Sequence, residues 1–220
     1  MFKRKILSKL EAWKRDERHK PLILRGARQV GKTTVVNEFG SQFDNYLYFN
    51  LEMNESVRLF EMDIPLNDLV NMLFASLGKS QREGSTLIFI DEIQNSPKTI
   101  ALLRYFYEQR PDLYVIAAGS LLENLVDVNV SFPVGRVMYM ALRPCSFYEF
   151  LGAIGKTNLL AVLSQKPEYT VVFHEQLMHH FNQYTIIGGM PEAVQRYAET
   201  QDIVAIEDVY ETLVQAYKDD

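Results

Sequence analysis

The chain has 220 residues, of which 47% are hydrophobic and 23% are charged, so it is long enough to bury the core of one domain with a small appendage. Its net charge of −5 excludes an overall basic field that would attract nucleic acid, although a local basic patch stays open. The single cysteine, Cys145, rules out an internal disulfide and no apolar run approaches the ~18 residues of a membrane span, so we expect a cytoplasmic protein without membrane contact.

Helical and strand-forming patterns alternate along the first two thirds of the chain. Residues 4–18 carry apolar side chains at helical spacing and predict a lead-in surface helix. Five runs predict strands: residues 22–24, 46–51, 86–90, 114–118 and 137–142. Helical patterns fall between them at residues 32–39, 67–78 and 99–109. Apolar strands that alternate with helices are typical of a parallel sheet covered on both faces, so we predict an α/β fold of three layers.

The strand signal fades after residue 146. Residues 146–165 and 172–220 read as helical, with breaks at Lys166-Pro167 and at residues 188–191. We therefore predict a core domain at residues 1–150 and a helical lid at residues 151–220. Because a helical pattern still runs at the last residue, we also expect this sequence to be the N-terminal part of a longer protein with a further C-terminal domain.

A phosphate-binding motif lies between the first predicted strand and the helix after it. GARQVGKT, residues 26–33, fits G-x-x-x-x-G-K-[ST] at every fixed position. Such a loop surrounds a triphosphate with backbone N–H groups, and the N-terminus of the following helix adds donors and a favourable dipole. We expect the nucleotide to be held by Gly26, Ala27, Arg28, Gln29, Val30, Gly31, Lys32, Thr33 and Thr34.

Two side chains of this motif suit phosphate and metal chemistry. Lys32 reaches the β- and γ-phosphates as a point charge, and the Thr33 hydroxyl suits Mg²⁺, which prefers oxygen ligands. The alternative is a chance match in a surface loop, but the apolar strand before the motif and the helix after it supply the context that a phosphate loop requires. The motif therefore predicts a nucleotide with Mg²⁺.

Two carboxylates, Asp91 and Glu92, directly follow the apolar run of the third predicted strand. The carboxyl end of a central strand is where ligands bind in open α/β sheets. Asp91 is placed to support the Mg²⁺, and Glu92 to act as the general base that activates water. The alternative is an ordinary strand end with two solvated carboxylates. A glutamate at this position favours hydrolysis over transfer of phosphate to a small-molecule hydroxyl.

The segments GARQVGKTT, IFIDEIQ, AAGSLL, PVGRV, RPCSFYEFL and GGMPEAV together resemble the bacterial and archaeal AAA+ ATPases that are related to the origin-recognition and STAND ATPases. The group it resembles carries a C-terminal nuclease-like domain, and the likeness covers nearly the whole chain. It implies a P-loop NTPase fold of AAA+ type with a helical lid. It also implies ATP or ADP as the nucleotide, and subunits that associate on nucleotide.

The resemblance further implies roles for residues outside the phosphate loop. Ser120 falls where such ATPases carry a sensor of the γ-phosphate, and it equally fits the N-cap of a helix. Arg136 falls where an arginine reaches a γ-phosphate in cis or in trans, or is simply a surface arginine. Met190 and Pro191 fall in the lid element that covers adenine or ribose, with Pro191 in the first turn of a helix. Asn50 matches an asparagine that holds the catalytic glutamate away, or a turn residue.

Three functions stay open at this point. The first is Mg²⁺-dependent ATP binding and hydrolysis that drives or gates an unnamed effector. The second is a nucleotide-dependent switch with slow or no turnover, regulating a protein partner or the C-terminal domain. The third is a small-molecule phosphotransferase, which predicts that Glu92 is dispensable. The acidic balance does not support nucleic acid as a partner of this segment.

Overall fold

The computed structural model describes residues 2–81, 83–120, 133–164 and 170–218, which fall into two compact units. One unit, Ile6–Leu142, contains the sheet, and the other combines Met1–Lys5 with Arg143–Asp220 and is helical. The chain therefore passes between the units twice, after Lys5 and after Leu142. Residue 150, the end of the core domain proposed from the sequence, lies inside helix α6 (Phe147–Ala153).

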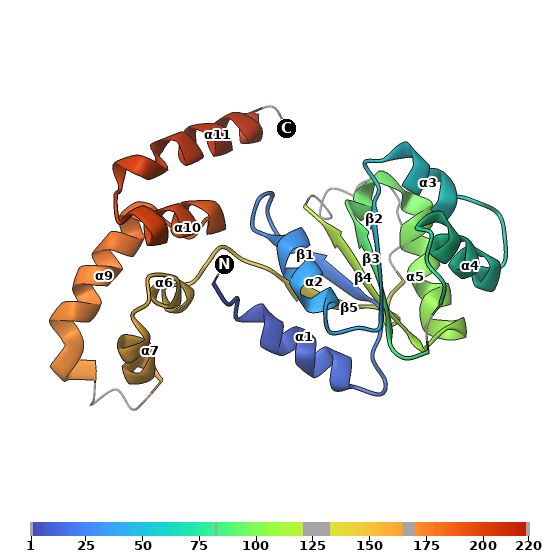
Figure 1. Ribbon diagram of the computed structural model, residues 1–220, viewed down its shortest axis with the longest axis horizontal. Coiled ribbons are helices and arrows are strands. Elements are labelled where there is room, and N and C mark those ends of the chain that lie inside the picture. Colours follow the sequence, from blue (N-terminus) through green and yellow to red (C-terminus); the bar gives the residue numbers. More distant parts are fainter. Residues whose placement is uncertain (1, 82, 121–132, 165–169, 219–220) are drawn as a thin grey trace. The chain divides into compact units, whose positions relative to one another are not determined.

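Five parallel strands form the sheet in the order β2-β3-β4-β1-β5 (Figure 1). They are β1 (Leu22–Arg25), β2 (Asn45–Asn50), β3 (Thr86–Asp91), β4 (Leu113–Gly119) and β5 (Met138–Ala141). Every residue of β3 is buried, which explains its uninterrupted apolar run. The parallel α/β fold expected from the sequence is confirmed, and all five predicted strands are present.

Helices cover both faces of the sheet and complete its three layers (Figure 1). Alternate residues of the strands point to opposite faces, so that Leu87 and Phe89 join one apolar cluster while Ile88 and Ile90 join the other. The first cluster contains α1 (Ile6–Arg15) and α2 (Lys32–Gly40). The second contains α3 (Asn54–Phe60), α4 (Leu66–Ser76) and α5 (Pro97–Gln109).

The strand order brings three loops together. β4 lies between β1 and β3, with Arg25 paired to Gly119 and Ile90 paired to Ala117. Because parallel strands end at the same edge of a sheet, the segments that follow β1, β3 and β4 leave from neighbouring points of that edge. The phosphate loop, the Asp91-Glu92 pair and Ser120 occupy these three segments.

The second unit consists of helices around a small apolar core. They are α6 (Phe147–Ala153), α7 (Thr157–Leu163), α9 (His174–Ile187), α10 (Pro191–Thr200) and α11 (Glu207–Lys218). Gly188, with φ 72°, ends α9 at the break that the sequence predicts, and Pro191 begins α10 as expected. A second break, at Gln201 with φ 55°, was not predicted. Cys145 is buried in this core, and burial raises the pKa of its thiol to about 11, so it is no activated nucleophile.

The first residues of the chain are fastened to α6. The Arg4 guanidinium lies 3.0 Å from Oε1 of Glu149 and donates a second hydrogen bond to the Arg143 carbonyl. Glu149 also accepts from the Lys5 N–H and completes a capping box with Ser146 at the start of the helix. Arg4 and Glu149 are 5% and 9% exposed, so this ion pair belongs to the interior of the helical unit.

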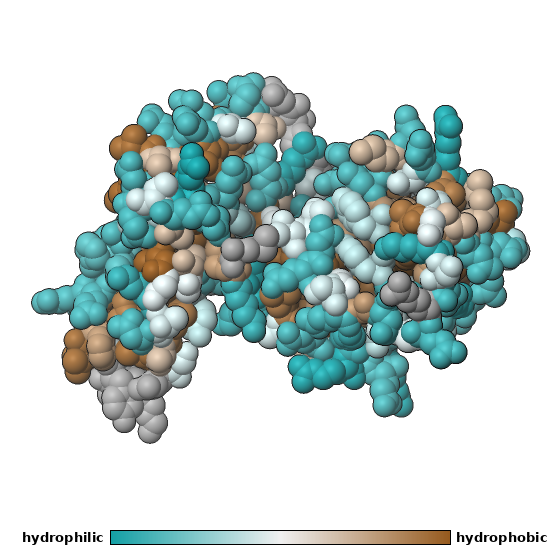
Figure 2. Space-filling view, in the orientation of Figure 1, coloured by the Kyte–Doolittle hydropathy of each residue, from teal (hydrophilic) through white to brown (hydrophobic). Residues whose placement is uncertain are grey.

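Polar side chains dominate the visible surface, with apolar ones between them (Figure 2). Several large apolar side chains of the helical unit are exposed, including Val171, Val172, Ile186 and Val204. None of the helices in the described part of the chain combines the length and the hydropathy of a membrane-spanning segment.

Candidate functional site: the phosphate loop and the carboxylates that face it

The phosphate loop leaves β1 and enters α2 at the carboxyl edge of the sheet (Figure 1). Its two glycines are needed for different reasons. Gly31 has φ 87° and caps α2 in the left-handed region, where a side chain is strained. Gly26 has no such φ, but a Cβ there would lie 2.4 Å from the Leu142 carbonyl oxygen. Gly26 therefore lets the loop pass close to the end of β5.

The other loop residues divide into exposed and buried ones. Ala27, Arg28 and Gln29 are exposed, as is Thr34 in the first turn of α2, whereas the Val30 side chain is fully buried in the core. Val30 thus has only its backbone to offer a ligand. Gln29, with φ 60°, is one of three non-glycine residues with positive φ among those described, and such backbone strain collects at functional sites.

Lys32 lies beneath the loop rather than in solvent. Its ammonium donates to the carbonyl oxygens of Gly26 (2.9 Å) and Ala27 (3.0 Å), and the residue is 6% exposed. Burial lowers the pKa of Lys32, while the negative charges of Glu92 and Asp91 act to raise it. A phosphate that binds here would therefore compete with the carbonyl oxygens of Gly26 and Ala27 for the Lys32 ammonium.

Thr33 and Asp91 meet across the site. The Thr33 hydroxyl donates a hydrogen bond of 2.6 Å to Oδ2 of Asp91, joining α2 to the end of β3. Asp91 is 3% exposed, and burial raises the pKa of its carboxyl although the bonds from Thr33 and from the Glu92 N–H oppose this.

These two oxygens fit Mg²⁺, a hard cation that takes few protein ligands and fills its remaining positions with phosphate oxygens and water. The described residues contain no group of three or more His, Cys, Asp or Glu side chains placed to hold a metal without such help.

Glu92 is held in an unusual conformation directly after β3. Its backbone is left-handed, with φ 53° and ψ 46°, and it caps the 3₁₀ turn Ile93–Asn95. Its Oε2 accepts a hydrogen bond of 2.5 Å from Nε2 of Gln94. The sequence predicts a role for Glu92 but not for Gln94, whose only signal is its position two residues later in IFIDEIQ.

Ser120 follows β4 at the centre of this edge. Its Oγ is buried and has no hydrogen-bond partner among the described residues. The residues after Ser120, whose helix it was expected to cap, lie outside the described residues, so the capping alternative is not tested. A buried hydroxyl without a partner suits a sensor that awaits a phosphate oxygen.

Arg136 lies at the other edge of the sheet. It precedes β5, which runs parallel to β1, so it lies where the strands begin and the phosphate loop lies where they end. Its Nε is 2.6 Å from Oε1 of Glu108 near the end of α5. Four strand residues span roughly 13 Å, so this arginine does not reach the loop of its own chain.

Three further expected residues have local roles in this structure. Asn50 accepts a hydrogen bond from the Glu52 N–H (2.9 Å), which is the geometry of the turn alternative. Met190 and Pro191 connect α9 to α10 within the helical unit. The Cys145 N–H donates to the Gly189 carbonyl (2.6 Å), which fixes this connection to the segment that enters α6.

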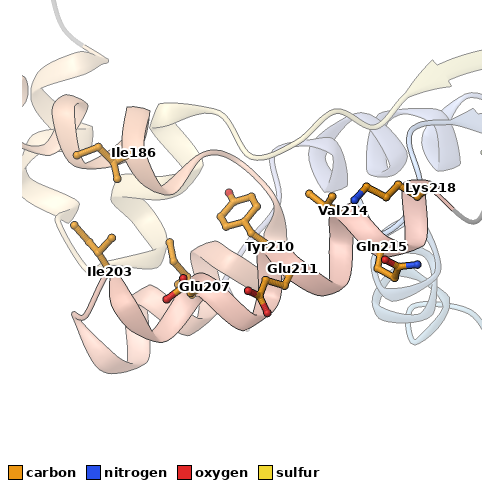
Figure 3. A pocket seen from close by; sticks show the side chains of 9 residues that line it. Ile186, Ile203, Glu207, Tyr210, Glu211, Val214, Gln215 and Lys218 are labelled. Atoms are coloured by element: carbon orange, nitrogen blue, oxygen red, sulfur yellow. The ribbon is translucent and has the colours of Figure 1, made fainter.

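A hollow of about 580 Å³ lies on the helical unit between α9 and α11 (Figure 3). Apolar side chains of Ile186, Ile203 and Val214 line it together with the carboxylates of Glu207 and Glu211. The Lys218 ammonium also lines the hollow, but two carboxylates outnumber it, so the hollow is less suited to the triphosphate of a nucleotide than the phosphate loop is.

Comparisons with known proteins agree with the fold. Among solved structures, the Walker-type ATPase paby2304 of Pyrococcus abyssi matches 100% of this chain and 75% of its own, with 18% identity and a TM-score of 0.58. The Aeropyrum pernix ORC1 protein in complex with DNA matches 66% of this chain and 45% of its own, with 15% identity and a TM-score of 0.42. Drosophila ORC bound to DNA matches 88% and 58%, with 15% identity and a TM-score of 0.49. At such identities the first likeness shows the fold alone.

The family assignment comes from the sequence itself. No curated protein sequence matches the chain. A family model described as an AAA domain matches residues 18–151, which is more than half of the chain and includes the phosphate loop, the Asp91-Glu92 pair, Ser120 and Arg136. The chain therefore belongs to the AAA domain family.

Proposed function

We propose that this chain is a Mg²⁺-dependent ATPase module that drives or gates an effector. The hydrogen bond between Thr33 and Asp91 is the observation that carries the proposal, because it joins the phosphate loop to the strand-end carboxylates. The negative charge of Glu92, the next residue, acts to raise the pKa of the Lys32 ammonium. We infer that the loop, Thr33 and Asp91 as metal ligands, and Glu92 as base act together at this edge of the sheet, as hydrolysis of a phosphoanhydride requires.

Each residue then has a defined task. Backbone N–H groups of the loop and the Lys32 ammonium bind the β- and γ-phosphates, and the Ser120 hydroxyl donates to a γ-phosphate oxygen. Thr33 and Asp91 hold the Mg²⁺, which neutralises charge on the phosphates when bound. Glu92 takes a proton from water as the water oxygen bonds to the γ-phosphorus, and the bond to the ADP oxygen breaks.

Arg136 acts in trans in this proposal. The support is its position before β5, from which its own phosphate loop is out of reach. An arginine supplied by a second subunit stabilises charge in the transition state and typically raises the rate by about 10³–10⁵-fold. Subunits therefore associate on ATP, and each loop is completed by its neighbour. The same observation favours a slow nucleotide-dependent switch as second candidate, because a lone chain lacks that arginine.

The test is Mg²⁺-ATP hydrolysis by the purified chain over a range of protein concentrations. The rate per subunit rises with concentration, and Lys32→Ala, Glu92→Gln and Arg136→Ala each abolish most of it, while Glu92→Gln still binds ATP. Mixing Glu92→Gln with Arg136→Ala restores turnover, because the mixed assembly contains sites with an intact base and an intact neighbouring arginine. Tight ATP binding without turnover at any concentration would leave the switch instead.

A further inference from the structure

The 3₁₀ turn Ile93–Asn95 holds a polar group with no part in the chemistry described so far. Gln94 donates through Nε2 to Oε2 of Glu92, at 2.5 Å. The other end of the same amide, Oε1, is buried and accepts no hydrogen bond from any described residue. Exchanging the amide nitrogen and oxygen would set two acceptors against each other, so the donor faces Glu92.

The turn that carries Gln94 is anchored by the residues on either side of it. The Ile93 side chain is 1% exposed and packs in the core, and the Ser96 N–H donates to the Ile93 carbonyl (3.1 Å). Ser96 is fully buried and caps α5 by accepting from the Thr99 N–H. Gln94 therefore extends from a fixed backbone, as a residue must if it is to hold a neighbour in place.

A buried amide whose oxygen has no partner destabilises the fold, so its remaining hydrogen bond is expected to have a function. A buried acceptor without a partner loses the hydrogen bonds that water gave it in the unfolded chain. A residue of similar size without polar atoms, such as leucine, would avoid this loss. The bond to Glu92 is the one contact of the Gln94 side chain among the described residues that only a donor can make.

We propose that Gln94 is a positioning residue for ATP hydrolysis, holding the Glu92 carboxylate through one oxygen so that the other faces the attacking water. This inference rests on the proposed function. Among the described residues no other group donates to the Glu92 side chain, which has three rotatable bonds and is half-buried. Without Gln94 the carboxylate samples many rotamers, and the fraction of time in which its free oxygen meets the water falls.

The test compares Gln94→Leu and Gln94→Glu with the wild-type chain. Leucine removes the donor at similar size, and glutamate replaces it with a second negative charge. Both variants lose at least about 10-fold in kcat, which corresponds to ~1.4 kcal/mol of barrier, while the affinity of Gln94→Leu for ATP changes little because leucine adds no charge and leaves the phosphate loop unaltered. Asn95→Ala is the matched control, since Asn95 is an exposed residue of the same turn. It keeps the wild-type kcat.

The outcomes separate this inference from the proposed function. If the wild-type chain hydrolyses ATP and both variants keep its kcat, or exceed it, Gln94 does not position the base and the inference is wrong. A parallel loss of kcat and of ATP affinity, with a lower melting temperature, would reduce Gln94 to a structural residue. If the wild-type chain binds ATP but shows no turnover at any concentration, the proposed hydrolysis fails first, and the positioning role falls with it.

Discussion

Replacing Arg4 with methionine tests whether the first residues of the chain stabilise the helical unit. Breaking a buried ion pair by removing one partner costs about 3–5 kcal/mol when the remaining charge is left bare. Glu149 is not left bare, because the N–H groups of Lys5 and Ser146 (both 2.8 Å) and the Ser146 hydroxyl (3.0 Å) still donate to it. We therefore expect Arg4→Met to destabilise this unit by about 2–3 kcal/mol.

The effect depends on pH in a definite direction. Burial on its own would raise the pKa of Glu149, but hydrogen bonds from Ser146, Lys5 and Arg4 outweigh it and bring the pKa below the usual 4.5. A carboxyl with a lowered folded-state pKa stabilises fully above its usual pKa and loses that contribution as pH falls through the lowered value. Without Arg4 the pKa of Glu149 rises, so the contribution of Glu149 to stability is smaller in Arg4→Met, and its loss is complete at a higher pH than in the wild type.

Hydrogen exchange of amides in α6, followed by mass spectrometry between pH 4 and 7, reads the helical unit by itself. Lys3→Met is the matched control, because Lys3 is an exposed basic residue of the same segment. The double variant Arg4→Met/Glu149→Gln should recover part of the protection, since it leaves no buried charge. Equal exchange in Arg4→Met and Lys3→Met at every pH would refute the reasoning.

Two further predictions concern the nucleotide site. Asp91→Asn should raise the melting temperature of the ligand-free chain at neutral pH, because burial raises the pKa of Asp91 and its ionised form therefore destabilises the fold until pH falls through that raised value. The same variant should lose at least ~100-fold in Mg²⁺-ATP hydrolysis, and a wild-type rate would remove Asp91 from the site. Gly26→Ala should destabilise by about 1–3 kcal/mol and weaken ATP binding, because its Cβ would meet the Leu142 carbonyl at 2.4 Å. Gly152→Ala, with its nearest atom at 3.6 Å, should show neither effect.

The features of the fold that the sequence predicts are those that depend on the spacing of residues close together in the chain. The apolar run that ends in Asp91 identifies a buried strand, because a strand covered on both faces has no polar side to alternate with. The phosphate loop is equally local, since its glycines and lysine stand at fixed offsets between a strand and a helix. Helix α3 was missed because its seven residues, NESVRLF, are too few to show a period. The break at Gln201 was missed because glutamine seldom adopts a left-handed backbone, so nothing in the sequence marks it.

The sequence does not predict which group each side chain contacts in the folded chain. Gly26 was predicted only as a residue of the phosphate loop, whereas the structure adds its close approach to Leu142, which is 116 positions away and directly follows β5. Gln94 belongs to no motif. Its role is inferred only from the structure, in which its amide nitrogen donates to Glu92 and its buried amide oxygen has no partner among the described residues. Hydrogen bonds between side chains depend on rotamers and on burial, which no spacing rule contains.

The direction of the parallel strands places Arg136 and the phosphate loop at opposite edges of the sheet. In a parallel sheet the residue before a strand and the residue after its neighbour lie at opposite edges, whatever the strand order. Arg136 precedes β5 and the phosphate loop follows β1, so one chain cannot use both on one nucleotide without refolding the sheet. In our proposal, Arg136 must leave its ion pair with Glu108 to contact the nucleotide of a neighbouring subunit. Because this ion pair lies at the surface, breaking it costs little free energy. In our proposal, assembly therefore recruits the arginine with little loss of stability, and turnover rises with protein concentration.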